Sequence, residues 1–332
     1  MTWPTPSWWY QRPTITSFLL YPLSLAWLLG SRMRRFDNVG YQGDAHLILV
    51  GNATAGGAGK TPTAIALAEL LASQKPAFIT RGYGGRITDT YEVLPQDSPK
   101  AVGDEALLLA SYAPTFIGKD RTAAANKAAT QHQLLIMDDG LQNHPSLRRD
   151  TVLLIVDSED GFGNGHIIPA GPLRETIPSA LSKAHGIILI GDGPPPPACQ
   201  KSSVQIFRAR RTFTAGGLPL AGLRVWAFCG IARPERFFQA LRSMGAVVVG
   251  QEILADHQPI NSRLLKRMTT AAQQQKAVLM TTEKDMARLS PENRQGLYPL
   301  IMKLEFEHPQ DLKNFLLNRM NPQDSLAEMP HL

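Results

Sequence analysis

The stretch LVGNATAGGAGKTPTAIALAELL, residues 49–71, places a glycine-rich loop between two apolar segments. Residues 45–52 (AHLILVGN) predict a short buried strand, because they are continuously apolar and end at glycine-rich punctuation. Residues 61–73 (TPTAIALAELLAS) predict a helix with Pro62 in its first turn, where a missing N–H costs little. A strand, a glycine loop and a helix in this order wrap backbone N–H groups around a phosphate chain. The stretch therefore predicts a phosphate-binding loop.

The expected loop leads into the helix with a lysine and a threonine. In this arrangement Lys60 reaches the β- and γ-phosphates, and the Thr61 hydroxyl binds Mg²⁺. The pattern departs from the usual one because a threonine stands at its first position, where glycine is usual. A glycine-rich turn without a ligand is the alternative, but the flanking strand and helix favour nucleotide binding. The loop positions are Thr54, Ala55, Gly56, Gly57, Ala58 and Gly59.

Length and composition limit the classes of protein to consider. A chain of 332 residues exceeds one typical domain, so two lobes are expected, and 43% apolar residues suffice for ordinary cores. Cys199 and Cys229 provide neither a disulfide framework nor a metal-binding spacing, which suits a reducing compartment. The net charge of +6 favours anionic partners, but charge alone does not distinguish nucleic acid, a membrane surface and a phosphorylated substrate.

An almost uncharged apolar segment, ITSFLLYPLSLAWLLGS, occupies residues 15–31 and contains Pro22. At about 1.5 Å per residue, a helix of this length falls slightly short of the ~30 Å hydrocarbon core of a bilayer. A secretory signal fits poorly, because the apolar region is long and no small-residue cleavage site follows. The alternatives are a buried core helix and a membrane anchor that dips into one leaflet or marginally spans it. Flanking aromatic residues, which suit the headgroup zone, and arginines, which suit anionic phospholipid headgroups, favour the anchor: Trp3, Trp8, Trp9, Tyr10, Arg32, Arg34 and Arg35.

From residue 44 onward, strand-like and helix-like segments alternate along the chain. Helix-like stretches at 104–113 and 120–131 lie among apolar strand candidates, which are 76–80, 114–118, 134–138, 151–157 and 186–191. This alternation predicts an α/β fold, with a P-loop NTPase-like parallel sheet and helices on both of its faces. In such sheets, ligands gather outside the C-terminal ends of the strands.

A second alternation begins beyond residue 205 and predicts a smaller α/β lobe. A helix candidate at 234–245 lies among strand candidates at 224–231, 246–250 and 277–285. We therefore expect three parts: a membrane-seated helix at 1–35, a P-loop domain at 36–204 and a smaller lobe at 205–332. The last helix of the chain can pack back on the first of these lobes.

Paired carboxylates follow two of the expected elements. The strand at 134–138 ends in Asp138 and Asp139, and beside a phosphate loop such carboxylates bind Mg²⁺ directly or through water. A simple turn is the alternative, because paired carboxylates repel one another unless a cation lies nearby. Asp104 and Glu105 stand at the start of an expected helix. Capping of the helix explains an acidic residue there as well as a role in the site does.

Other polar residues at strand ends give weaker signals. TTEKD, at residues 281–285, invites comparison with the guanine-reading motif of GTPases, but its order differs and we interpret it as structural. The remaining candidates are loop arginines, which are commonly just solvated, and a His beside an Asp after an expected strand: Arg121, Arg174, Asp256 and His257.

Taken together, these segments resemble one family. GNATAGGAGKTP, TRGYGG, VGDEALLLA, MDDGLQ, GPLRE, FCGIARPERF, ADHQ and TTEKD occur in the order and spacing of the tetraacyldisaccharide 4′-kinases, the lipid A 4′-kinases of Gram-negative bacteria. The resemblance extends from the apolar N-terminus to about residue 290. It implies ATP-dependent phosphorylation of the 4′-hydroxyl of a tetraacylated glucosamine disaccharide 1-phosphate, giving lipid IVA. It also implies a location at the cytoplasmic face of the inner membrane and a lipid, not a nucleic acid, as partner.

The resemblance also implies roles for residues at matching positions. Lys60 and Thr61 are similar to the phosphate-binding lysine and the Mg²⁺-binding threonine of the family. Asp104, in GDE, resembles the catalytic aspartate that accepts the proton of the attacking sugar hydroxyl. His257, in DHQ, resembles the histidine that orients this carboxylate or tunes its pKa.

Further positions match the surroundings of the metal and the nucleotide. Glu105, Asp138 and Asp139 are similar to the carboxylates around Mg²⁺ and the phosphates, and Asp139 is also expected to take part in catalysis. One local difference is that Leu141 and Asn143 stand where the family is expected to have Phe and His. Four other residues match active-site positions without an assigned individual role: Arg121, Gln142, Arg174 and Glu175.

The chemistry is consistent with these residues without the family name. Phosphoryl transfer depends mainly on positioning and charge neutralisation, and an Asp base of ordinary pKa is adequate when the transition state is loose. A histidine from the second lobe would complete the site only when the lobes close on ATP and lipid.

Two other classes remain open at this stage. A membrane-associated regulatory ATPase of the Min/Par type shares the GGxGKT pattern. Such proteins carry a signature lysine five residues before the phosphate-loop lysine, and here that position is Ala55. A soluble small-molecule kinase or ATP-dependent ligase, whose N-terminus merely packs on the core, is the second.

Overall fold

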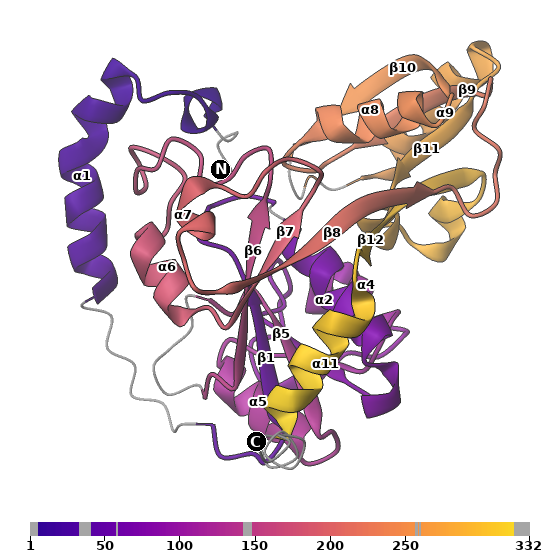
Figure 1. The fold of residues 1–332 in the computed structure, drawn as a ribbon. Helices are drawn as coiled ribbons and strands as arrows, with labels where there is room; N and C mark the ends of the chain where they lie inside the picture. Colours follow the sequence, from indigo (N-terminus) through magenta and orange to yellow (C-terminus); the bar gives the residue numbers. More distant parts are fainter. Residues whose placement is uncertain are drawn as a thin grey trace, which may run out of the picture.

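Twelve strands join in one sheet that runs through the described part of the chain (Figure 1). The computed structural model describes residues 6–32, 41–57, 59–141, 148–255, 258 and 260–321. Below, the first lobe denotes residues 41–204 and the second lobe residues 215–296. Two long strands, with the helix that follows the second of them, connect the lobes.

The first lobe is built from alternating strands and helices. Its helices are α2 (Lys60–Leu70), α3 (Pro99–Val102), α4 (Asp104–Ala110), α5 (Arg121–Ala129), α6 (Ile177–Lys183) and α7 (Pro197–Gln200), with a 3₁₀ turn η2 (Ala72–Gln74). Its strands are β1 (His46–Gly51), β2 (Ala77–Thr80), β3 (Tyr91–Glu92), β4 (Thr115–Ile117), β5 (Leu134–Asp138), β6 (Thr151–Asp157) and β7 (Gly186–Ile190).

The second lobe repeats the alternation on a smaller scale. Its elements are β9 (Arg224–Cys229), α8 (Pro234–Ser243), β10 (Val247–Ile253), α9 (Ser262–Gln274), β11 (Val278–Thr282), α10 (Glu283–Ala287) and a 3₁₀ turn η3 (Pro291–Arg294). The connecting strands are β8 (Gln205–Thr214) and β12 (Leu297–Phe306), and α11 (Pro309–Met320) follows β12. The boundary expected between residues 204 and 205 thus falls where β8 begins.

The strand order of the sheet is β10-β9-β11-β12-β8-β7-β6-β1-β5-β2-β4-β3. The β8–β12 and β3–β4 pairs are antiparallel and every other pair in this order is parallel. In the registers of β1, Val50 lies beside Asp138 of β5, and Gly51 lies beside Leu154 of β6. The C-terminal ends of these three strands therefore meet at one edge of the sheet.

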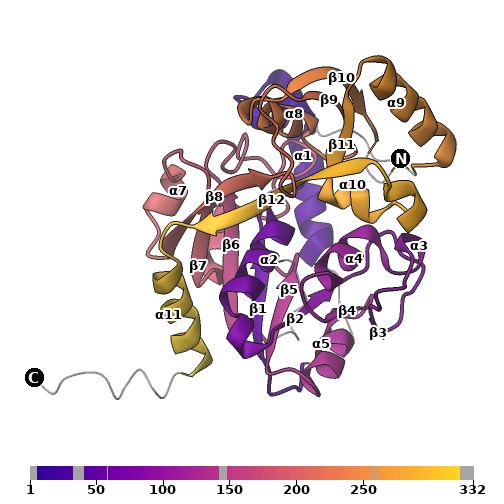
Figure 2. The ribbon, with the colours of Figure 1, turned by 90° about the vertical axis from the view of Figure 1, so that its right-hand side faces the viewer.

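Both faces of the sheet in the first lobe are covered by helices, so the interior positions of its central strands are apolar. Leu47 and Leu49 face a core shared with α5 and α6, whereas Ile48 and Val50 face a core shared with α2 and α11. This alternation is the period of two of a strand buried on both sides. Leu312 and Leu316 place α11 in the second of these cores, against the first lobe, and Figure 2 shows α11 beside α2.

Helix α1 (Ile15–Arg32) packs against the first lobe through its polar side. Ser17 and Ser24 are two turns apart and both are buried. The Ser24 hydroxyl donates to the Ile167 carbonyl at 2.8 Å and accepts from the Ala170 N–H at 3.2 Å. Leu28 packs against the first-lobe core, but most of the large apolar side chains point outward, so α1 is not a core helix: Ile15, Phe18, Leu19, Tyr21, Leu23, Leu25, Trp27 and Leu29 are all exposed.

Within the described ranges, none of the helices has both the length and the apolar character that crossing a bilayer requires. A short 3₁₀ turn, η1 (Ser7–Tyr10), precedes α1 and contacts the first lobe as well. The Asn164 N–H donates to the Trp9 carbonyl at 2.7 Å, and the Trp9 indole donates to the Pro169 carbonyl at 3.2 Å. The N-terminal segment is therefore hydrogen-bonded to the loop that follows β6.

The predicted α/β architecture, with a mostly parallel sheet and helices on both faces, is confirmed. The expected strands form within one to three residues of their predicted ends. Two strand ends differ by three residues: β10 continues beyond 250 to Ile253, and the strand expected at 277–285 ends at Thr282, where a helix begins. The Thr282 hydroxyl accepts the N–H of Asp285 at 3.1 Å, which caps the new helix and stops the strand.

Candidate active site

The glycine-rich loop lies between β1 and α2, and α2 begins at Lys60. Gly59 has a φ of 90° and Gly56 a φ of 110°, in the left-handed region that favours glycine. A Cβ on Gly59 would lie 2.7 Å from the Ile190 side chain, so space also requires glycine there. The first N–H groups of a helix have no partners within the helix and carry a partial positive charge. The loop therefore ends in an anion-binding position.

Thr54, the departure from the usual pattern, has a structural explanation. It pairs in an antiparallel bridge with Leu173, and its hydroxyl accepts a hydrogen bond from the Asn52 amide at 3.1 Å. The only non-glycine residues with positive φ within the described ranges are Lys75, Asp139 and Lys276, so Thr54 needs no glycine backbone. The Arg174 N–H donates to the Ala53 carbonyl at 2.8 Å, which ties the GPLRE segment to the phosphate loop.

Lys60 points along the loop toward the end of β5. Its ammonium group donates to the Asn52 side-chain carbonyl at 3.0 Å and lies 3.5 Å from an Asp139 carboxylate oxygen. Burial alone would raise the pKa of Asp139, but Lys60, Arg174 and Arg121 together outweigh burial and lower it. Asp139 also has a φ of 58°, in the left-handed region that is common in turns. The sequence left a simple turn and a charged site as alternatives, and Asp139 has the features of both.

Asp138 is buried directly below the start of α2. Its Oδ2 accepts the Thr61 hydroxyl at 2.6 Å, whereas its Oδ1 is buried without a hydrogen-bond partner. Burial raises the pKa of Asp138 from 3.8 to about 6, and the nearby carboxylates of Glu105 and Asp139 act in the same direction, against Thr61 and Lys60. A buried anionic oxygen that lacks a donor is a position that a cation would stabilise.

These residues fit Mg²⁺ as one partner in a shared site. The described residues contain no group of three or more His, Cys, Asp or Glu side chains arranged to hold a metal ion. Mg²⁺ seldom needs such a group, because it is commonly held by one or two carboxylates together with substrate phosphates and water. Asp138 and the Thr61 hydroxyl, beside the phosphate loop, supply oxygen ligands of this kind.

Two arginines from different elements hold the end of β5. Arg121, the first residue of α5, donates to the Asp139 main-chain carbonyl at 2.8 Å. Arg174 lies 3.2 and 3.3 Å from the two Asp139 carboxylate oxygens. Both arginines thus contact Asp139 beside the phosphate loop, and a role in binding phosphate stays a prediction.

Asp104 and Glu105 begin α4, and both interact with the second lobe. Asp104 is the first helical residue and Gly103 is the N-cap, so Asp104 does not occupy the capping position. Its Oδ2 accepts from Arg288 Nε at 2.7 Å, and its side chain is only 5% exposed. Glu105 pairs with Lys284 at 2.9 Å.

A cavity of about 710 Å³ lies between the phosphate loop, the end of β5 and the second lobe. Glu105, Asp138 and Asp139 line it, while Asp104 lies behind this lining, in its ion pair with Arg288. The described lining contains four acidic side chains and eight basic ones, and the excess favours a multiply charged anion. The basic residues are Lys60, Arg81, Arg121, Arg174, Arg211, Arg233, Arg236 and Lys284.

Some predicted site residues are elsewhere. Glu175 is buried beside α6, where it accepts from Ser179 Oγ at 2.6 Å and pairs with Lys183, and it does not line the cavity. Ala55 and Thr54 contribute to the loop from outside the cavity lining. Leu141 packs in the first-lobe core. Four candidate residues lie outside the described residues: Ala58, Gln142, Asp256 and His257.

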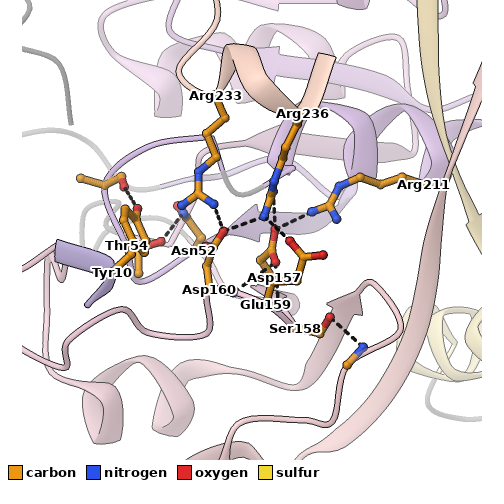
Figure 3. Close-up of polar contacts among 12 residues, drawn as sticks. Tyr10, Asn52, Thr54, Asp157, Ser158, Glu159, Asp160, Arg211, Arg233 and Arg236 are labelled. Carbon is orange, nitrogen blue, oxygen red and sulfur yellow. Dashed lines mark hydrogen bonds and ion pairs between the residues drawn. The ribbon is translucent and has the colours of Figure 1, made fainter. Parts of the chain in front are cut away.

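A network of charges that joins the lobes was missed from sequence (Figure 3). Asp157, the last residue of β6, is 3% exposed and contacts Arg211 at 2.5 Å and Arg236 at 2.7 Å. Asp160 pairs with Arg233 and Arg236. The network thus links the edge of the first-lobe sheet to β8 and to the start of α8.

The N-terminal segment also reaches this network. Tyr10 donates its hydroxyl to the Ala55 carbonyl at 3.2 Å, and the Arg233 guanidinium lies 4.4 Å from the centre of the Tyr10 ring. The segment that precedes α1 therefore contacts the phosphate loop and the second lobe at once. One signal could have identified Asp157: TVLLIVD, like LLIMD, is an apolar strand that ends in aspartate at the ligand-binding edge.

Comparisons with known proteins establish the family of this chain. A family model described as tetraacyldisaccharide-1-P 4′-kinase matches residues 16–321. The chain belongs to this kinase family. A tetraacyldisaccharide 4′-kinase of Jannaschia sp. is 42% identical over 315 residues, covering 91% of this chain and 94% of the relative. Another, from Methylorubrum extorquens, is 40% identical over 320 residues, covering 94% of this chain and 97% of the relative.

The fold of the tetraacyldisaccharide-1-P 4′-kinase family is seen in a solved structure as well. The crystal structure of the "apo" form of LpxK from Aquifex aeolicus in complex with ATP matches with a TM-score of 0.70 at 21% identity, covering 92% of this chain and 100% of that chain. The resemblance drawn from the ordered motifs is confirmed, and the Min/Par alternative is not favoured by these matches.

Removing the charge of Asp157 is expected to lower the stability of the folded protein strongly. In Asp157→Asn, the buried ends of Arg211 and Arg236 would face a neutral amide, which we expect to cost about 3–5 kcal/mol of unfolding free energy in urea. Glu159→Gln is the matched control, because Glu159 contacts the same Arg236 at 3.0 Å but is 71% exposed, and about 0–1 kcal/mol is expected.

The stability that Asp157 contributes is expected to depend on pH in a defined direction. Burial opposes ionisation of Asp157, but Arg236 and Arg211 outweigh burial and lower its folded-state pKa. The contribution is therefore complete above the unfolded pKa of about 4 and is lost as the pH falls through the folded pKa. Equal losses in the two variants at pH 7 would contradict the assignment.

Asp138→Asn, in contrast to Asp157→Asn, is expected to raise the free energy of unfolding when no nucleotide or metal is bound. Because the folded-state pKa of Asp138 is raised to about 6, its ionisation costs stability as the pH rises from about 4 through 6. The variant should gain about 2–3 kcal/mol at pH 7.5 and less at pH 5, measured by urea unfolding with a chelator present. A gain that is independent of pH would show that burial of the charge is not the cause.

Proposed function

We propose that this chain transfers the γ-phosphoryl group of ATP to the 4′-hydroxyl of a tetraacyldisaccharide 1-phosphate, giving lipid IVA. One observation carries the proposal: in a member of this kinase family, a phosphate loop, four carboxylates and an excess of basic side chains line one cavity. A volume of about 710 Å³ is within the range of small-molecule sites, and a triphosphate matches the excess of positive charge.

In this proposal, the loop, Lys60 and the two arginines that meet at Asp139 hold the phosphate chain. Lys60 exchanges its contact with Asp139 for the β- and γ-phosphates, and Arg121 and Arg174 neutralise the charge that spreads over the transferred group. Asp138 and Thr61 would hold Mg²⁺, with Asp139 and Glu105 close by. When bound, this ion supplies charge neutralisation at the phosphate oxygens.

Asp104 is the proposed base. The 4′-oxygen forms a bond to the γ-phosphorus, its proton passes to the Asp104 carboxylate, and the bond from the γ-phosphorus to the bridging oxygen breaks. Asp104 lies one residue from Glu105, which lines the cavity, so it is near the site although its ion pair is buried. The roles of His257 as its partner, and of Gln142 and Glu175 in the site, rest on the family resemblance alone.

We further propose that α1 seats the enzyme on the cytoplasmic face of the bacterial inner membrane. Exposing acyl chains to water costs about 0.8 kcal/mol per CH₂, so the enzyme must meet its lipid at the interface. The outward apolar side of α1 suits the boundary between headgroups and acyl chains, and the arginines that follow it in the sequence suit anionic phospholipid. The anchor, the P-loop domain and the smaller lobe are proposed as the three functional parts, at 1–35, 36–204 and 205–332.

The activity is tested directly with ATP, Mg²⁺ and the disaccharide 1-phosphate lipid, scored by the mass gain of one phosphate. Lys60→Met is expected to lower kcat by about 100-fold or more, because it removes a charge aimed at the transferred group. Lys127→Met, on the exposed side of α5, should remain within about twofold of wild type. Lack of transfer by wild type, or an active Lys60→Met variant, would refute the proposed function.

Membrane seating is tested on the apolar side of α1. Leu19→Glu with Leu23→Glu should lower the partition coefficient onto vesicles of one-third anionic phospholipid by at least about tenfold, because each leucine contributes about 1.5–3 kcal/mol when buried. Gln273→Glu with Gln274→Glu adds the same charge on exposed positions of α9 and controls for repulsion. Unchanged vesicle co-sedimentation of the α1 variant would exclude this face. Deleting 1–35 is less specific, because it also removes the contacts of Trp9 and Tyr10.

A further inference from the structure

The TTEKD segment, interpreted from sequence as structural, connects β11 to α10 at the boundary between the lobes. The Thr282 side chain caps α10, and Lys284 and Arg288 follow four residues apart. Side chains at this spacing lie on the same face of a helix. Both reach the first residues of α4 in the first lobe: Lys284 Nζ lies 2.9 Å from Glu105 Oε1, and Arg288 Nε lies 2.7 Å from Asp104 Oδ2.

Arg288 is itself held by the second lobe. Its Nη1 lies 3.0 Å from Asp285 Oδ1, and the other Asp285 oxygen accepts from the Gly230 N–H at 2.9 Å and from the Thr282 hydroxyl at 2.7 Å. Asp285 thereby ties the end of β9, the start of α10 and the guanidinium together. Arg288 therefore has a close ion-pair partner and a main-chain carbonyl, that of Gly230 at 3.5 Å, within its own lobe.

Burial distinguishes this ion pair from its neighbour. The side chains of Arg288, Asp104 and Asp285 are 8%, 5% and 0% exposed, whereas those of Lys284 and Glu105 are 22% and 34% exposed. A buried pair with fixed partners holds one orientation, while a half-exposed lysine pair is mobile and weak. The second lobe therefore fixes Asp104 firmly and Glu105 loosely.

We propose that Arg288 is a positioning residue for Asp104, so that the second lobe orients the carboxylate that receives the proton of the sugar hydroxyl. This inference rests on the proposed function, in which Asp104 is the base. The terminal torsion of an aspartate is broad, so an unheld carboxylate turns freely, and misplacement by about 1 Å can cost 100-fold in rate.

The positioning role of Arg288 also explains why an arginine contacts Asp104, whereas a lysine, Lys284, contacts Glu105. A planar guanidinium can bind Asp285 and Asp104 at once in a fixed geometry, which a lysine ammonium cannot reproduce. Arg288 takes no proton and forms no bond in the reaction. Its effect on turnover acts through Asp104 alone.

A double-mutant cycle tests this coupling. Arg288→Gln should lower kcat at least about tenfold, with the KM for ATP within about twofold of wild type, because Arg288 does not line the cavity described for the nucleotide. In the Asp104→Asn background the same change should cause no further loss, since both act through one carboxylate. Arg288→Lys should recover part of kcat by restoring the charge. Arg294→Gln, an arginine of the same lobe bound to main-chain carbonyls, should stay within about twofold of wild type.

The outcomes separate the inference from the function on which it rests. Equal losses from Arg288→Gln in the two backgrounds, or an unchanged or increased kcat, would overturn the positioning role and leave the kinase proposal intact. Wild-type turnover by Asp104→Asn would instead refute Asp104 as the base. Thermal melting and ATP calorimetry establish that each variant is folded, and if Arg288→Gln does not fold, the same cycle with Arg288→Lys decides by whether its loss persists without the Asp104 carboxylate.

Discussion

The parallel pairing of β1 with β5 and β6 is the constraint on which the site depends. It brings the C-terminal ends of three buried strands to one edge, so that the phosphate loop, Asp138 and Asp157 emerge side by side. Asp138 has lost most of its water there, and the Thr61 hydroxyl supplies only one of the hydrogen bonds that its charge needs. A strand edge that concentrates unpaired negative charge beside a helix N-terminus can bind cations and phosphates together.

The second lobe contributes charge of the opposite sign. Basic residues reach the site by two routes: from the connecting strand β8 and from α8 of the second lobe to Asp157 and Asp160, and from α10 of the second lobe to the start of α4. Both routes cross between elements that are far apart in sequence. Because β8 and β12 join the two halves in one sheet, these contacts form along a continuous backbone framework rather than across a flexible linker.

Local pattern predicted the elements well and their long-range charge pairing poorly. The strand, loop and helix around Lys60 follow from apolar periodicity and glycine placement, and the carboxylates after β5 follow from the edge rule for parallel sheets. Arg121 and Arg174 could be expected near these carboxylates only because the sequence places both arginines in loops. Nothing in the periodicity indicates that Arg236 meets Asp157 across 79 positions, or that Glu175 turns toward Lys183, since such partners depend on how the lobes and helices pack. Asp104 was recognised by resemblance, yet its burial against Arg288 is a property of the junction between lobes.

The docking of α1 by its serines fixes more than its position. Ser17 and Ser24 define which way the helix is rotated about its long axis, so the outward leucines face one direction relative to the body of the molecule. A bilayer that accepts those leucines therefore also sets the tilt and height of the whole enzyme above the lipid surface. The loop bonded to Ser24 continues into the strand-like segment that pairs with Thr54. Mechanical load on the helix would in this way pass along the main chain to the glycine-rich turn within a few residues.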